Sequence, residues 1–211
     1  DYAAIKLASE RVQYLNENLT PEGLPIFPSE PLPYLRSIFN VYLLGIEKWR
    51  DLFTDRQLLS IHYLRETIRR ISSLVDASNL NETRRLREAV ITVLALVLDK
   101  IIDSNSSLCR WRPTSQDIGN TFGRQALGIV WDFAEINIFS GSTRDWDHSI
   151  DGCINAMLMA SDTVGVGTAQ QFSADQNPLP SDFAGLIFTD PPYYDSVPYA
   201  NLSDFFYVWL R

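Results

Sequence analysis

The stretch GLIFTDPPYYDSVPYANLSDFFYVWLR, residues 185–211, decides how this sequence is interpreted. Its first five residues, 185–189, are small or apolar and predict a buried strand. Asp190 is followed by two prolines, which have no backbone N–H for a sheet ladder, so the strand must end at Asp190. An acid and the aromatic Tyr193 therefore follow the carboxyl end of a strand, the edge at which open α/β sheets bind ligands.

The Asp-Pro-Pro-Tyr tetrapeptide suits a planar substrate that carries an exocyclic amine. Such an amine is a poor nucleophile because its lone pair is delocalised into the ring. We expect the Asp190 carboxylate and the Pro191 carbonyl to accept hydrogen bonds from its two N–H groups, while Tyr193 stacks on the ring. The alternative is a strand exit kinked by the prolines, in which Tyr193 and Tyr194 pack on the core.

The composition is that of an ordinary globular protein. The chain has 211 residues, 45% of them hydrophobic, and a net charge of −8. It has no apolar run near the roughly 20 residues that span a bilayer, and its N-terminus does not resemble a secretory signal. Cys109 and Cys153 are far apart, which favours a reduced, cytoplasmic setting. Because the sequence lacks an initiator Met and stops in the apolar run 209–211, we expect a piece of a longer protein.

Charge is distributed unevenly along the chain. Residues 48–87 carry nine Lys or Arg against five acids, whereas residues 132–211 carry eleven acids against two arginines. The first segment suits contact with phosphates, although solvated helix faces are the alternative explanation. The stretch 104–142 is either a surface loop or a binding segment, and its arginines include Arg110, Arg112 and Arg124.

Hydrophobic periodicity predicts a largely helical chain that ends in strands. Thr54 and Gln57 are spaced as a capping box, and the two long central helices should pack antiparallel. The expected helices cover residues 2–19, 55 to about 79, 82–103 and 145–161. The expected non-helical segments are a Pro-rich linker over 20–33, a partly strand-like stretch over 37–53, and strands over 163–172 and 183–189.

Three other chemistries are not supported by the sequence. The glycines of residues 164–167 lack the G-x-G-x-x-G spacing of a phosphate loop, and no helix follows them. No G-x-S-x-G elbow is present, and nothing ties His62 or His148 to a nucleophile; His62 fits a core or surface position. No dense group of His, Cys and Asp predicts a metal site.

These motifs resemble those of the amino-group DNA methyltransferases of the class I, S-adenosylmethionine-dependent fold. The sequence is most similar to the large adenine-specific DNA methylases that also carry a zinc ribbon. The likeness covers most of residues 40–211, through KWRDLFTDRQLL, NSSLCRWRPTSQDIGNTFGRQALGIVWDFAEINIFS and TDPPYYDSVPYANLSDFFYVWLR. It implies methyl transfer from S-adenosylmethionine to the N6 atom of adenine in DNA, with a target-amine pocket formed by Asp190, Pro191, Pro192 and Tyr193.

The sequence also departs from that family. The F-x-G-x-G turn that cradles the methionine half of the cofactor is absent, as is the zinc ribbon, and Gly167-Thr168-Ala169 stands where the family has Gly-Asp-Ala. The cofactor contacts that the resemblance implies are Gly167, Thr168, Ala169 and Asp190. The expected DNA contacts are Tyr194, Tyr199, Arg110, Arg112 and Arg124, with Asp195 at the pocket rim and core packing as the alternative for Tyr199.

We therefore expect an α/β chain that forms a partial Rossmann-like methyltransferase fold with a large, mostly helical insertion. Its expected parts are an N-terminal helix and Pro-rich linker (1–36), a mainly helical region (37–160), and methyltransferase strands with the DPPY loop (161–211). Its expected partners are DNA and the remainder of the methyltransferase chain, in a role such as host modification, restriction or phage defence. Two alternatives stay open: a methyltransferase that acts on a protein glutamine amide, and a non-catalytic fragment that binds DNA or a partner protein.

Overall fold

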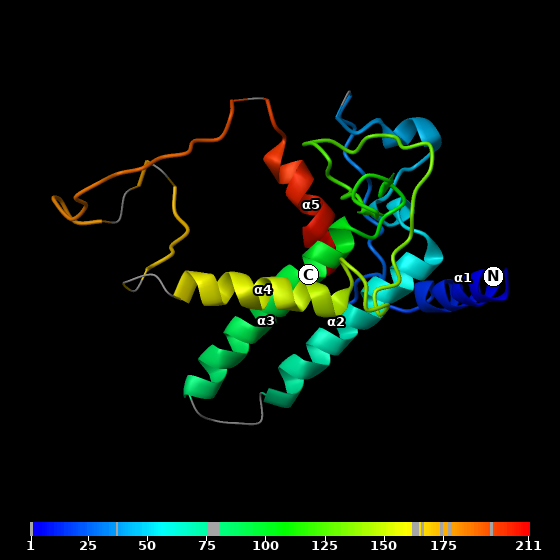
Figure 1. Cartoon of the computed structure of the whole chain (residues 1–211), viewed down its shortest axis with the longest axis horizontal. Helices are drawn as coiled ribbons and strands as arrows, with labels where there is room; N and C mark the ends of the chain where they lie inside the picture. Colours follow the sequence, from blue (N-terminus) through cyan, green and yellow to red (C-terminus); the bar gives the residue numbers. More distant parts are fainter. Residues whose placement is uncertain are drawn as a thin grey trace.

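The chain is a mixed, mostly helical structure (Figure 1). The computed structural model describes residues 2–36, 38–75, 81–161, 165, 167–173, 175–176, 179–194 and 196–211. Its helices are α1 (Tyr2–Asn16), α2 (Asp55–Val75), α3 (Asn81–Asp103), α4 (Trp146–Ser161) and α5 (Tyr199–Leu210). Its shorter elements are the 3₁₀ turns η1 (Asn40–Leu44) and η2 (Trp49–Leu52) and the strands β1 (Trp111–Arg112) and β2 (Asp117–Ile118).

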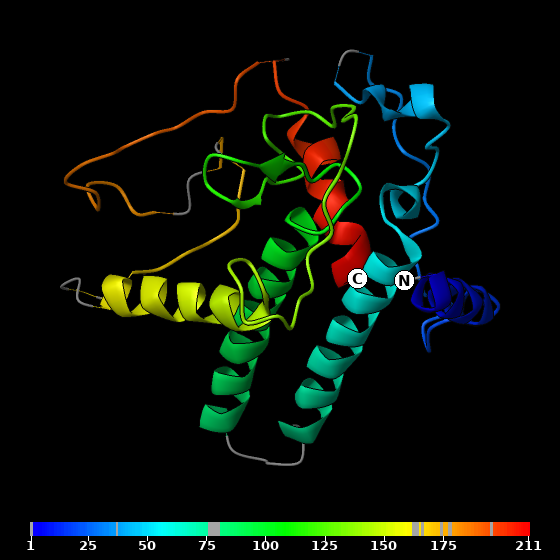
Figure 2. The same cartoon turned by 45° about the vertical axis from the view of Figure 1, so that its right-hand side comes forward.

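Helices α2 and α3 form the antiparallel pair that the sequence predicted, and the two views show them side by side (Figures 1 and 2). The capping box at the start of α2 is confirmed: the Thr54 N–H donates to Gln57 Oε1 at 2.8 Å, and the Gln57 N–H donates to Thr54 Oγ1 at 3.3 Å. The turn predicted around Ser78 and Asn79 lies outside the described residues. His62 on α2 is buried with its ring edge-on to Phe27, as a core position requires.

The core contains an aromatic cluster through which α5 joins the helical pair. Phe205 and Trp209 of α5 are both fully buried. Phe53 stacks on Phe205 with ring centroids 5.7 Å apart, and it meets Trp209 edge-on at 5.2 Å. Burying three such rings is a major source of stability, so α5 is an integral part of this core.

The partly strand-like stretch 37–53 was predicted wrongly, because it forms η1 and η2 instead of a strand. The segment it pairs with is the Pro-rich linker, which offers few backbone donors. Only isolated pairing results, with Leu32 N–H donating to Glu47 O at 2.7 Å and a single bridge between Pro31 and Lys48. Gly45, with φ of 78°, then ends η1 in the left-handed conformation.

The expected strands over 163–172 and 183–189 do not form in the described residues. Instead the described residues between α4 and α5 follow an open, extended arc away from the helices (Figure 1). Leu186 is 84% exposed and Phe188 93% exposed. A strand needs neighbours to complete its hydrogen bonds, and the short antiparallel β1–β2 pair is the only sheet within the described ranges. None of the helices described is long and apolar enough to span a membrane.

Candidate functional site

The DPPY residues lie on the open arc between α4 and α5. Asp190, Pro191 and Pro192 are all exposed, and Tyr193 and Tyr194 are 66% and 96% exposed. The tyrosines therefore do not pack on the core, contrary to the alternative of a purely structural strand exit. Within the described residues the Asp190 carboxylate has no hydrogen-bond partner, which leaves its oxygens available to a ligand.

The residues implied to contact the cofactor lie on the same arc, and none of them lines a cavity formed by the described residues. Gly167, Thr168 and Ala169 are exposed and lack regular secondary structure. Asp190 shares no described cavity with them. Asp195 lies outside the described residues.

Helix α5 fixes the end of the arc, six residues after Tyr193. Tyr199 opens α5 and remains 49% exposed, so it is not buried in the core. The Pro198 carbonyl accepts the first helical hydrogen bond, from the Leu202 N–H at 3.0 Å. The buried half of α5 then anchors the DPPY segment to the helical core through Phe205.

Arg110 and Arg124 line one hollow of about 370 Å³, and its lining contains no carboxylate. Neither guanidinium has an ion-pair or hydrogen-bond partner in the part of the chain that is described. The two cations are therefore available to an anion. The other residues of the hollow are Leu108, Asn120, Thr121, Gly123, Ala126, Gly128, Ile129 and Val130.

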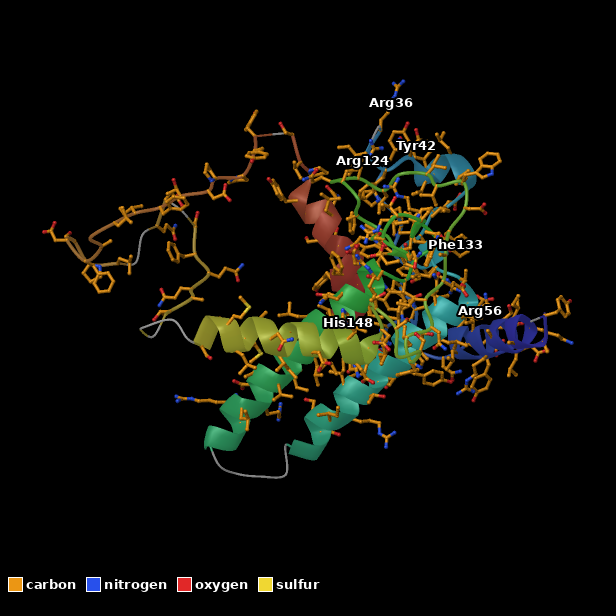
Figure 3. The ribbon with its side chains drawn as sticks, viewed as in Figure 1. Arg36, Tyr42, Arg56, Arg124, Phe133 and His148 are labelled. Atoms are coloured by element: carbon orange, nitrogen blue, oxygen red, sulfur yellow. The ribbon has the colours of Figure 1, made fainter. Side chains whose placement is uncertain are left out.

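Arg124 also connects this hollow to α5, beside which Figure 3 shows it. A second hollow, of about 530 Å³, lies between the loop carrying Arg124 and the helix residues Leu202, Ser203 and Phe206. Asp103 lines this second hollow as well. The structure thus brings Arg110, Arg124 and the first half of α5 to one region of the molecule.

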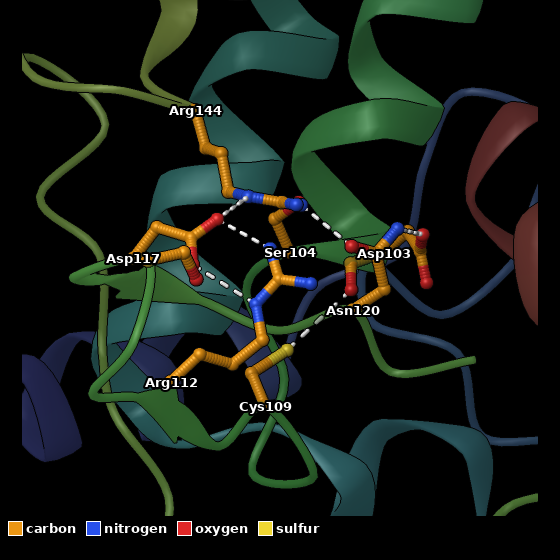
Figure 4. Close-up of polar contacts among 8 residues, drawn as sticks. Asp103, Ser104, Cys109, Arg112, Asp117, Asn120 and Arg144 are labelled. Atoms are coloured by element: carbon orange, nitrogen blue, oxygen red, sulfur yellow. Dashed lines mark hydrogen bonds and ion pairs between the residues drawn. The ribbon is translucent and has the colours of Figure 1, made fainter. Parts of the chain in front are cut away.

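Arg112 differs from the other two arginines because it is already paired. Its Nε donates to Asp117 Oδ1 at 2.9 Å, and its Nη2 contacts Asp117 Oδ2 (Figure 4). These hydrogen bonds, with one from Ser115, hold the pKa of Asp117 well below its usual range. Arg112 therefore joins β1 to β2, and we do not expect it to bind phosphate while this pair is intact.

A polar network attaches the β1–β2 hairpin and the following loop to the end of α3 (Figure 4). Arg144 donates to Asn120 Oδ1 at 2.6 Å, to Ser104 Oγ at 3.2 Å and to Asp117 Oδ2 at 3.4 Å. It does so from a left-handed backbone with φ of 70°, which is uncommon for a residue other than glycine.

Asp103, the last residue of α3, completes the network. Its Oδ1 accepts the Phe122 N–H at 3.2 Å, its Oδ2 accepts the Asn120 amide, and its carbonyl accepts the Thr121 N–H at 2.6 Å. These hydrogen bonds attach the loop that leads to Arg124 to the end of helix α3. Sequence reasoning missed this network, because the residues that Arg144 and Asp103 contact are 17 to 40 positions away in the sequence and no local pattern links them.

Comparison with known proteins adds no assignment to this geometry. No family model, no curated protein and no solved structure matches the chain.

Proposed function

We propose that this chain is part of a DNA methyltransferase that transfers a methyl group from S-adenosylmethionine to the N6 amine of a flipped adenine. The observation that carries the proposal is the placement of Asp190-Pro191-Pro192-Tyr193. The motif is exposed, its carboxylate has no partner among the described residues, and it precedes α5, whose first half shares a hollow with Arg124.

The role proposed for these residues is to position the target amine for attack on the methyl donor. The Asp190 carboxylate and the Pro191 carbonyl accept hydrogen bonds from the two N–H groups of the amine. The nitrogen lone pair is thereby turned out of conjugation with the ring and towards the methyl donor. Tyr193 stacks on the base and offsets part of the cost of unstacking it from the duplex. When bound, S-adenosylmethionine would supply the methyl group: the C–S bond would break as the C–N bond forms, S-adenosylhomocysteine would leave, and the amine proton would pass to Asp190 or water.

The exposed apolar residues of the arc favour the proposal that this segment joins a β-sheet completed by the remainder of the enzyme. Leu186, Ile187 and Phe188 are consecutive and all largely exposed, whereas single exposed apolar residues are the usual case. A parallel sheet buried on both faces reads as such an apolar run. In the proposed enzyme this segment is a strand of a Rossmann-like sheet to which the remainder of the methyltransferase contributes.

Calorimetric titration of S-adenosylmethionine into the chain tests the catalytic proposal against simple DNA or protein binding. We expect saturable binding that is weakened in Asp190→Ala and Thr168→Ala. Asp175→Ala, which removes an exposed acid from the same arc, is the matched control and should bind as the wild type does. The absence of any binding at millimolar cofactor would favour the non-catalytic alternative.

The glutamine alternative is separated by the acceptor that is methylated. Asp at position 190, where methylases of protein glutamine have Asn, favours a nucleobase. With radiolabelled methyl donor and equal amounts of DNA and protein acceptor, we expect the label in DNA. Label in the protein acceptor alone would support the glutamine alternative instead.

A further inference from the structure

The hollow lined by Arg110 and Arg124 has the composition of an anion site. The chain has a net charge of −8, so a polyanion cannot be attracted by the molecule as a whole and must be bound locally. The side chains of Asn120 and Thr121 line the same hollow but are engaged with Asp103 and Arg144. The two guanidinium groups are therefore the donors that can contact an anion, because their planar sets of N–H groups can bind two phosphate oxygens at once.

Two exposed tryptophans are adjacent in sequence to residues that line the hollow. Trp111 directly follows Arg110 and is 52% exposed, while Trp131 directly follows the lining residue Val130 and is 100% exposed. An indole ring left wholly in water contributes nothing to the core, but it offers a flat surface on which a nucleobase can stack. Cations beside exposed aromatic rings are the combination found in sites for unpaired nucleic-acid strands.

We infer that this hollow binds a backbone phosphate of a locally unpaired DNA strand, and that a base next to that phosphate stacks on Trp131. Within a duplex both faces of a base are covered by its neighbours, so stacking on Trp131 requires an unstacked base. The inference rests on the proposed function for the choice of DNA, because a methylase that flips its target base creates such a strand. It assigns a phosphate-binding role to Arg110 and Arg124 and not to Arg112, which is held by Asp117.

Fluorescence anisotropy with a labelled single-stranded DNA oligonucleotide, without cofactor and over a series of salt concentrations, tests this inference. Arg110→Ala and Arg124→Ala should each reduce the slope of log K against log salt by about 0.7, the value for one phosphate contact on a single strand. Trp131→Ala should weaken binding about tenfold, as expected for the loss of one stacked base. A matched duplex and an RNA of the same sequence should bind more weakly than the single-stranded DNA.

Matched controls are available on distant surfaces of the chain. Arg85→Ala removes an exposed arginine near the start of α3, and Tyr2→Ala removes an 82% exposed ring from α1. Both should leave affinity and salt slope unchanged, and unfolding curves should show that all five variants remain folded. Equal losses in Arg85→Ala and Arg124→Ala, an unaltered affinity in Trp131→Ala, or tighter binding of the duplex or the RNA would each overturn the inference.

The outcome is independent of methyl transfer. Binding through this hollow without any methylation would leave the inference standing and count against the proposed function. If the protein methylates DNA but the Arg110 and Arg124 variants bind single-stranded DNA normally, the proposed function stands and the inference fails.

Discussion

Phe122 packs edge-on against Phe205, with ring centroids 5.0 Å apart and the ring planes at 86°. Phe122 lies two residues before Arg124, and Phe205 lies in the middle of α5, the helix that follows the DPPY segment. The contact therefore joins the loop that carries a candidate phosphate-binding residue to the helix that tethers the candidate target-base loop. The two halves of the proposed site share one aromatic core.

Phe205→Ala should lower the free energy of unfolding by about 3–5 kcal/mol, because it removes a fully buried ring with several aromatic neighbours. Tyr207→Ala, on the exposed side of the same helix, should change it by less than about 1 kcal/mol. Urea denaturation followed by circular dichroism measures both. Equal effects of the two substitutions would mean that α5 is not packed as described.

Thr54→Ala should cost about 1 kcal/mol, since it removes the acceptor for the Gln57 N–H and the hydroxyl that contacts Glu135. The control is Thr67→Ala within α2, where the hydroxyl only bonds back to the Tyr63 carbonyl and alanine is the better helix former. Thermal unfolding should give a lower midpoint for the first variant and an unchanged or higher one for the second. The reverse order would contradict the capping box.

Asp99 should make the protein less stable as pH rises from 4 to 6. Burial raises its pKa to about 6 from 3.8, and its Oδ1 has no hydrogen-bond partner among the described residues. The carboxyl is neutral in both states below about pH 3, whereas above pH 6 the folded state must hold a poorly solvated charge. Asp99→Asn should therefore stabilise the protein at pH 7 by about 1–2 kcal/mol, with the gain shrinking towards pH 4 and vanishing below about pH 3.

Urea denaturation at pH 4, 5.5 and 7 measures this dependence. Glu88→Gln is the matched control, because it neutralises an exposed acid on the same helix. A stability difference between Asp99→Asn and the wild type that does not change with pH would refute the assignment.

Asp117 should act in the opposite direction. Its pKa is depressed in the folded state by Arg112, Ser115 and Arg144, so its contribution is complete above its ordinary pKa and is lost as pH falls through the folded-state value. Asp117→Asn should lower stability at pH 7, and the difference from wild type should shrink as the pH is taken below 4. Asp175→Asn, an exposed acid on the arc, should show no such convergence. Acid titration of both variants by circular dichroism gives the comparison.

Local sequence patterns predicted the parts of this fold that depend on local interactions. The capping box at Thr54 and the helices α1 to α4 were predicted because each helix satisfies its own backbone and has apolar residues at helical spacing, although Ile154 and Leu158 of α4 are exposed. The apolar run 185–189 was assigned to a strand, but a strand's hydrogen bonds come from other segments, and none of the described segments is paired with it. Helix α5 was not predicted, because its sequence, YANLSDFFYVWL, is largely apolar and aromatic, a composition that fits a strand as well as a helix.

The candidate site divides in the same way. The DPPY motif was visible because its residues are contiguous. The different roles of Arg110, Arg112 and Arg124 were not, because only the fold shows that Asp117 pairs with one of them and leaves the others free to line the hollow.

Nucleoside analysis of adenine-containing DNA, after incubation with S-adenosylmethionine and with the chain joined to the remainder of its methyltransferase, tests the central claim most directly. The account predicts N6-methyladenine with the wild type and with Asp175→Ala, and none with Asp190→Ala, whose exposed position should leave stability within about 0.5 kcal/mol of wild type. N6-methyladenine formed equally well by Asp190→Ala, or no methylated adenine from the wild type, would contradict it.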